Sequence, residues 1–139
     1  MTLSIRNQIA GTVTSVTAGE AMTSVRVRLE GGQDIVAAIT TDAAKELGLT
    51  EGSAVTALVK ATEVSLANRV VEGVSIRNQI PGTVVDVVAG PAMASVKVDV
   101  NGGGLTAAIT ADAARELGLA AGSSVVALIK ATEVSLSAA

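Results

Sequence analysis

The sequence lacks cysteine, histidine and all three aromatic residue types. Without cysteine there can be no disulfides, thiolate nucleophiles or Cys-ligated metals, and without histidine the usual zinc sites and the Ser-His-Asp and Cys-His catalytic arrangements are excluded. Carboxylates and lysines are all that remain for catalysis. We therefore predict neither a metal site nor an enzyme.

The absence of phenylalanine, tyrosine and tryptophan also limits the hydrophobic core. Apolar residues make up 49% of the chain, and almost all of them are alanine, valine, leucine or isoleucine. Each buried aromatic ring contributes about 150–250 Å² of buried surface, and a domain of about 65 residues buries only about 60% of its unfolded surface. Such a thin core predicts a homo-oligomer, in which contacts between copies add burial.

Charge and hydropathy exclude two further classes of protein. The net charge is −3 and the pI is near 4.9, so the chain lacks the general basic surface of a nucleic-acid-binding protein. No apolar run approaches the 18 or so residues that span a membrane, and the first residues do not follow the pattern of a secretion signal. We therefore expect a cytoplasmic protein with no membrane and no nucleic-acid partner.

The dominant feature of the sequence is an internal repeat. Residues 4–66 align with residues 75–136 with a single one-residue deletion, and 42 of the 62 aligned pairs are identical. A period near 70 residues is longer than a solenoid unit, so each copy is expected to be a domain. We place the domains at residues 1–68 and 69–139. The joint, residues 67–74, contains β-branched residues and is unlike a flexible Gly/Ser tether, which predicts a fixed relation between the domains.

Each copy has the pattern of a small β domain with one short helix. In the first copy, strands are expected over residues 11–16, 24–29 and 35–39, and one bent strand or two over residues 53–66. Their order, β-β-β-α-β(β), predicts a mainly β fold of two tandem OB-like β-barrels. A two-sheet sandwich of the same strands is the alternative.

The helix is expected within residues 40–49. Thr40 or Asp42 can cap its first amides, and Gly48 suits the left-handed position after its last turn. The second copy repeats this arrangement with Thr110, Asp112 and Gly118.

Comparing the two copies sorts the positive charges. Only Arg6 with Arg77, and Lys60 with Lys130, keep both residue type and setting, each inside a block that is identical in the two copies. Arg6 stands among hydroxyl and amide donors, and charge-assisted hydrogen bonds contribute about 1.5–3 kcal/mol each. The pattern is that of an anion site, although the spacing alone favours a solvated strand edge, with Lys60 paired to Glu63 or another carboxylate.

Three other functions are alternatives to anion binding. Acidic positions recur in both copies, as a glycosidase would require, but there is no aromatic residue to hold a sugar ring. An OB-type nucleic-acid binder needs a basic groove and aromatic stacking platforms, which are also missing. A purely structural trimer is the third alternative. Neither glycine-rich phosphate-loop motif occurs.

Five motifs together resemble the Mop domain of molbindins. They are the Ser-Ile-Arg-Asn-Gln start, the Gly-Thr-Val segment, the Thr-x-Asp-Ala-Ala helix, the Glu-Leu-Gly-Leu stop and the Lys-Ala-Thr-Glu-Val ending. Both copies match from end to end, so the chain resembles a tandem, di-domain molbindin. The resemblance implies OB-like barrels and intracellular binding of molybdate or tungstate for storage or homeostasis. It further implies a homotrimer that contains six Mop domains, with no cofactor besides the oxyanion.

The resemblance also implies which residues hold the oxyanion, at sites between domains and subunits. One wall would be Ser4, Arg6 and Asn7, with Ser75, Arg77 and Asn78 in the second copy; the other would be Lys60, Ala61 and Thr62, with Lys130, Ala131 and Thr132. Further backbone donors are expected at Gly19, Glu20, Ala21, Gly90 and Ala92. Pro91 has no N–H to give, which predicts unequal binding by the two copies.

Overall fold

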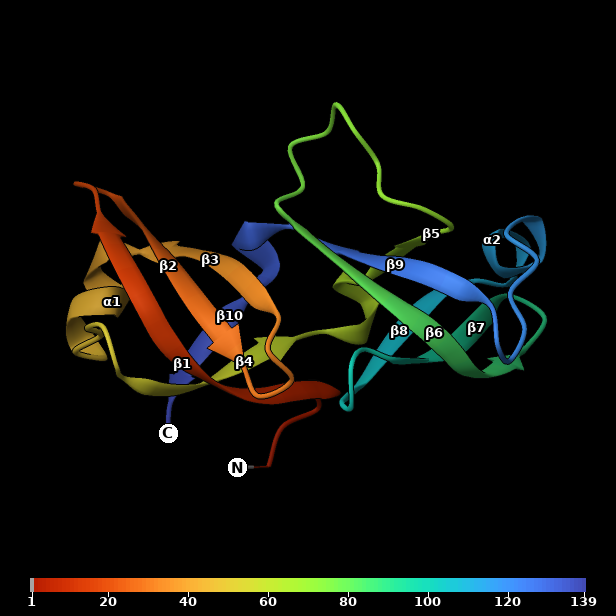
Figure 1. Ribbon diagram of the computed structural model, residues 1–139, viewed down its shortest axis with the longest axis horizontal. Helices are drawn as coiled ribbons and strands as arrows, with labels where there is room; N and C mark the ends of the chain where they lie inside the picture. Colours follow the sequence, from red (N-terminus) through yellow and green to blue (C-terminus); the bar gives the residue numbers. More distant parts are fainter. Residues whose placement is uncertain (1) are drawn as a thin grey trace.

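The computed structural model of the protein describes residues 2–139 and is mainly β (Figure 1). The elements of the first repeat are β1 (Asn7–Ala18), β2 (Met22–Leu29), β3 (Asp34–Thr40), α1 (Thr41–Glu46), β4 (Ala54–Val59), the 3-10 helix η1 (Ala61–Glu63) and β5 (Ser65–Ala67). The elements of the second are β6 (Asn78–Ala89), β7 (Met93–Asp99), β8 (Gly104–Thr110), α2 (Ala111–Glu116), β9 (Ser124–Ile129), the 3-10 helix η2 (Ala131–Glu133) and β10 (Ser135–Ala138).

These elements confirm the predicted fold class of two OB-like β domains, each with one short helix. The segment that could have been one bent strand or two is two strands, because η1 separates β4 from β5. No helix among residues 2–139 is long and apolar enough to cross a membrane.

The final strand of each repeat belongs to the sheet of the other repeat. The two antiparallel sheets have the strand orders β10-β4-β1-β2-β3 and β5-β9-β6-β7-β8. Ser135 of β10 pairs with Leu58 of β4, and Ser65 of β5 pairs with Leu128 of β9. Figure 1 shows β10, the last blue strand, lying beside β4 in the sheet that holds β1. Because of this exchange, each sheet contains strands from both repeats. The domain boundary between residues 68 and 69 divides the two sequence repeats and stays a prediction.

The core is built almost entirely from small aliphatic side chains. Along β2, Val25, Val27 and Leu29 are buried while the arginines between them are exposed, as the period-two pattern predicts. The buried apolar side chains of both repeats form one continuous cluster. The strand exchange therefore joins the two domains through a shared core.

The short helices begin and end at the predicted signals. The Thr40 hydroxyl accepts a hydrogen bond from the N–H of Ala43 at 3.1 Å, so Thr40 is the cap and Asp42 is not. Gly48 has a φ of +61°, a left-handed conformation that glycine adopts without steric cost. The second helix is capped in the same way by Thr110.

The joint between the repeats is the protruding loop between β5 and β6 in Figure 1. The side chain of Gln79 fixes its centre, because its Oε1 accepts from the N–H of Val71 and its Nε2 donates to the carbonyl of Val71, both at 2.9 Å. This pair of hydrogen bonds mimics a short strand ladder. The joint is thus tied to β6.

Candidate functional site

The predicted arginine and lysine of the first repeat lie side by side. Asn7 at the start of β1 pairs with Val59 at the end of β4, so Arg6 and Lys60 are neighbours just beyond that pair. Residues of both predicted walls, with Ile5 but without Asn7, line one cavity of about 240 Å³; its lining is Ser4, Ile5, Arg6, Lys60, Ala61 and Thr62. Segments more than fifty residues apart in the chain are therefore brought together as the sequence suggested.

The second repeat builds the same arrangement. Asn78 at the start of β6 pairs with Ile129 at the end of β9, which makes Arg77 and Lys130 neighbours in turn. As in the first repeat, the charged and hydroxyl side chains are exposed; these are Ser75, Arg77, Lys130 and Thr132. Ala131 is half-buried. A ligand can reach both places from solvent.

Each arginine is held by the backbone of its own segment. Nε of Arg6 donates to the carbonyl of Ser4 at 3.2 Å, and Nη2 donates to the carbonyl of Leu3 at 3.1 Å. Arg77 repeats both contacts with Ser75 and Val74, at 3.2 and 3.0 Å. A guanidinium has five N–H groups, so these two bonds leave three for a ligand. Fixing the side chain beforehand lowers the entropy lost when an anion binds.

The cavity lies where the chain crosses between the two sheets. Lys60 ends β4, the next residues form η1, which packs against β8 of the other sheet, and β5 then joins that sheet. In the second repeat η2 packs against β3 in the same way. The position of each lysine therefore depends on both domains.

Asn7 and Asn78 are the two predicted site residues that the structure buries. Each is only 3% exposed. The Asn7 amide donates to the carbonyl of Thr106 at 2.9 Å and accepts from its N–H at 2.7 Å, and Asn78 makes the same pair with Val36. Each asparagine thus joins its own strand to the main chain of the opposite sheet. Their part in anion binding stays a prediction, and the structure adds this second role.

We expect Asn7→Ala to destabilise the protein by about 1–3 kcal/mol, since it leaves the half-buried N–H and carbonyl of Thr106 without this partner. Urea denaturation measures the change. Gln8→Ala is the matched control, because Gln8 is exposed and its side chain donates only to the nearby carbonyl of Ile5. Equal stability of the two variants would show that the asparagine does not hold the sheets together.

The predicted backbone donors of the hairpin turns lie far from this cavity within one chain. Gly19, Glu20 and Ala21 follow the end of β1, whereas Arg6 precedes its start. The twelve residues of β1 span on the order of 40 Å at about 3.3 Å per residue. The first turn and the Arg–Lys pair of the same repeat therefore lie at opposite ends of β1 and do not form one site.

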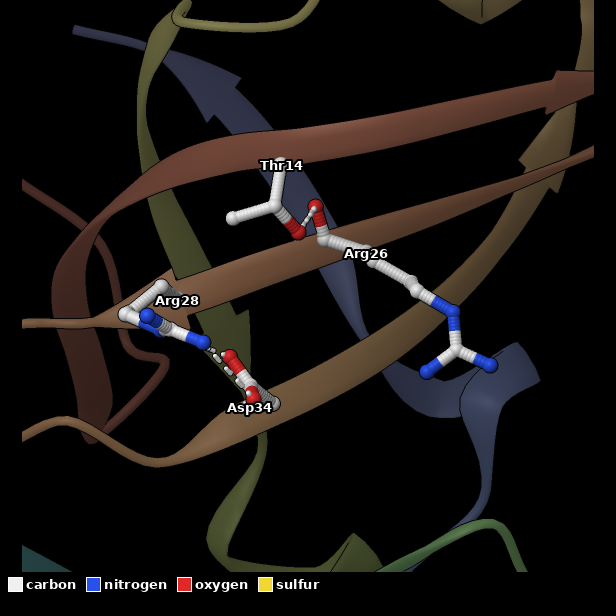
Figure 2. A network of polar contacts seen from close by, with 4 residues as sticks. All are labelled: Thr14, Arg26, Arg28 and Asp34. Carbon is white, nitrogen blue, oxygen red and sulfur yellow. Dashed lines mark hydrogen bonds and ion pairs between the residues drawn. The ribbon is translucent and has the colours of Figure 1, made fainter.

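Positive charges on the outer sheet face are arranged differently. Nε and Nη2 of Arg28 on β2 donate to the carboxylate of Asp34 on β3 at 2.9 and 3.1 Å (Figure 2). This hydrogen bonding lowers the pKa of Asp34 and raises that of Arg28. Figure 2 also shows the Arg26 guanidinium pointing away from this pair, while its carbonyl accepts from the Thr14 hydroxyl at 3.3 Å. Neither arginine lines the cavity beside Lys60.

One buried polar cluster was not predicted from the sequence. Thr23 and Thr41 are buried, with their hydroxyl oxygens 2.9 Å apart, and the Thr41 hydroxyl donates to the carbonyl of Gly19 at 2.8 Å. The aligned residues of the second repeat are Ala94 and Ala111. Two threonines that both become alanine in the other repeat were the signal that could have revealed this contact.

Two OB-like domains that exchange their final strands and carry an Arg–Lys pair at each crossover define a tandem two-domain β protein. The chain belongs to the TOBE domain family, whose model matches residues 3–66 and 74–136. The predicted resemblance to a di-domain molbindin made of two Mop domains is confirmed.

Three similar proteins are informative. The chain is 43% identical to the molybdenum-pterin-binding protein MopB of Rhodobacter capsulatus over 96% of its own length and 50% of the relative. It is 38% identical to the molybdenum transport protein ModE of Azotobacter vinelandii over 98% of its length and 51% of the relative. The chain thus spans about half the length of these curated relatives. A crystal structure of the cytoplasmic molybdate-binding protein ModG with molybdate bound matches all of both chains, with a TM-score of 0.96 and 37% identity.

Proposed function

We propose that the protein binds molybdate or tungstate as tetrahedral dianions and serves their storage or homeostasis in the cytoplasm. The observation that carries the proposal is the cavity in which Arg6 and Lys60, from distant segments, lie together beside the Ser4 hydroxyl. Two cations and a hydroxyl, with three guanidinium N–H groups still available, match an acceptor with four oxygens and two negative charges. Arg77 and Lys130 supply a second such place.

The comparisons support the same ligand. A full-length structural match at 37% identity holds molybdate, and the curated relatives are named for binding or transporting molybdenum. The family is one of binding, transport and regulatory proteins and not one of enzymes. We accordingly propose no catalytic activity and no cofactor other than the oxyanion.

The donor set also favours molybdate over phosphate. Guanidinium and ammonium groups only donate hydrogen bonds, and a fully deprotonated dianion only accepts them. Phosphate near neutral pH often carries a proton, which the two cations cannot accept and which only a hydroxyl oxygen such as that of Ser4 or Thr62 could, so its affinity is expected to be lower. Sulfate has the same charge as molybdate, so charge cannot distinguish the two anions. We propose that sulfate is rejected by size, because the pocket fits the longer metal–oxygen bonds of molybdate.

We further propose that the protein is a homotrimer of six Mop domains, with anions bound between subunits as well as between domains. Apolar side chains stand exposed on the second sheet, with Val85, Val88 and Met93 at 57, 63 and 49% exposure. These side chains lie outside the core of one chain, and contact between copies would bury them. It would also bring the hairpin turns of one copy to the Arg–Lys pairs of another. Light scattering is expected to give three times the 13.7 kDa of one chain.

Titration calorimetry with molybdate, sulfate and phosphate tests the proposed ligand. We expect saturable heat with molybdate, with dissociation constants in the micromolar range or below, and much weaker heat with the other two anions. Equal affinity for sulfate and molybdate would reduce the site to a general anion site. No heat with any of the three would contradict anion binding altogether.

A further inference from the structure

The β2–β3 and β7–β8 hairpins belong to different repeats and contact each other at their loops. Nδ2 of Asn101 donates to the carbonyl of Gly31, seventy residues away in the chain, at 2.5 Å. In the opposite direction, Nε2 of Gln33 donates to the carbonyl of Val100. A Cβ at Gly31 would lie 2.8 Å from the carbonyl oxygen of Asn101, so the two loops are in close contact. We call this contact, made by Gly31, Gln33, Val100 and Asn101, the hairpin clasp.

The loop of the β7–β8 hairpin is an Asn-Gly pair in a tight turn. Asn101 and Gly102 have φ values of +59° and +85°, and the Val100 N–H donates to the Gly103 carbonyl at 2.8 Å. Asparagine followed by glycine is the preferred pair for such two-residue turns. Both residues are exposed, and a Cβ built on Gly102 would meet no atom within 4 Å. The main chain at Gly102 is therefore sterically open.

An Asn-Gly pair can react with itself. The backbone nitrogen of Gly102 loses its proton to a base and attacks Cγ of Asn101; the N–Cγ bond forms, the Cγ–Nδ2 bond breaks and ammonia leaves. Water then opens the five-membered succinimide ring and gives aspartate or isoaspartate. The carboxylate of Asp99 accepts a hydrogen bond from the Gly102 N–H at 3.1 Å, so a base stands next to the proton that must leave. Glycine suits the attacking position because it has no Cβ to hinder the approach.

The other asparagines lack this combination of features. Asn7 and Asn78 are buried, hydrogen-bonded to the opposite sheet and followed by glutamine. Asn68 is exposed like Asn101, but Arg69 follows it and places a Cβ beside the attacking nitrogen. Among the four asparagines of the sequence, only Asn101 is both exposed and followed by glycine.

We propose that Asn101 is a site of non-enzymatic deamidation and that this modification opens the hairpin clasp. The product carries a carboxylate oxygen in place of Nδ2, and a carboxylate cannot donate to the Gly31 carbonyl. It adds one negative charge to a net charge of −3, and Glu30 lines the same cavity of about 340 Å³ between the loops. Isoaspartate also lengthens the main chain of the turn by one carbon. The contact between the two hairpins therefore weakens as the protein ages.

Peptide mapping of the aged protein by mass spectrometry tests the site. The folded full-length chain is incubated at mildly alkaline pH, and a sample from the start of the incubation corrects for deamidation during digestion. Trypsin places each asparagine in a different peptide, with Asn101 in residues 98–115 and Asn68 in residues 61–69. We expect the mass gain of deamidation, with a separate isoaspartate form, to accumulate faster in the first peptide than in the second. A gain at Asn101 that is no faster than at Asn68 would overturn the assignment of the site.

The variants Asn101→Asp and Asn101→Gly test the effect on the clasp. Both remove the donor to Gly31 and suit a left-handed turn position, but only the aspartate adds a charge. In ¹⁵N-labelled protein we expect the amide resonances of Gly31 and Gln33 to shift in Asn101→Asp as they do in the aged wild type, and to shift less in Asn101→Gly. The midpoint of thermal unfolding should fall in the same order.

Unchanged Gly31 and Gln33 resonances in both Asn101→Asp and the deamidated wild type would overturn the proposed opening of the clasp. Equal shifts in the aspartate and glycine variants would show that the added charge has no part in it. Neither measurement requires an oxyanion, so these outcomes are independent of the proposed function.

Discussion

Replacing Arg6 and Arg77 together by alanine is expected to abolish most molybdate binding. Each guanidinium has three N–H groups left for a ligand, and a charge-assisted hydrogen bond contributes about 1.5–3 kcal/mol. The loss of two such bonds at a site corresponds to a decrease in affinity of at least about a hundredfold. Calorimetry on the double variant measures both the affinity and the number of ions bound.

The fold is expected to survive this change. Both arginines are exposed, and their contacts are with carbonyls of their own segments and not with the core. The matched control is Arg26→Ala with Lys97→Ala, which removes the same charge from exposed positions on the outer faces of β2 and β7. Unchanged stoichiometry and affinity in the arginine variant, or an equal loss in the control, would contradict the assignment of the site.

A chain that ends at Val134 is expected to lose stability in the first sheet, although the deleted residues belong to the second repeat. The deletion removes β10, which pairs with β4 over four residues from Ser135 to Ala138. Three or four backbone hydrogen bonds at about 0.5–1.5 kcal/mol each correspond to a loss of about 1.5–6 kcal/mol. The deletion also exposes an unpaired edge of β4, which favours association between chains.

Hydrogen exchange locates this effect within the molecule. The amides of β4 that face β10 should exchange fast in the shortened chain, while those of β9 stay protected because β5 still covers them. The second sheet is therefore an internal control. Faster exchange in β9 and not in β4 would mean that the repeats keep their own final strands.

Much of the candidate site was predictable because both of its cations sit in blocks that are identical in the two repeats. Arg6 and Lys60 stood out against cations that change type between copies, such as Arg26 and Lys97. Comparison of the copies works as an internal alignment, since a residue that needs only solvation is free to change. The structure then brought Arg6 and Lys60 together at one cavity.

The role of Asn7 shows what a comparison of the two repeats cannot reveal. A repeated polar residue beside an arginine suggested a ligand donor, yet its amide is buried and bound to the main chain of Thr106. Sequence repetition says that a residue matters in both copies. It does not say whether the residue serves a ligand or the contact between domains, because both uses require the same fixed geometry.

The sequence by itself determined the duplication, the order of strands and helix within each unit and the approximate ends of each helix. These follow from local patterns, since alternation fixes which face of a strand is buried and capping residues fix where a helix starts. Only the tertiary structure decided which sheet each final strand joins. Ser65-Leu66 and Ser135-Leu136 are identical, so either strand suits either sheet edge. The choice is made by the path of the chain after each 3-10 helix and by contacts between the domains.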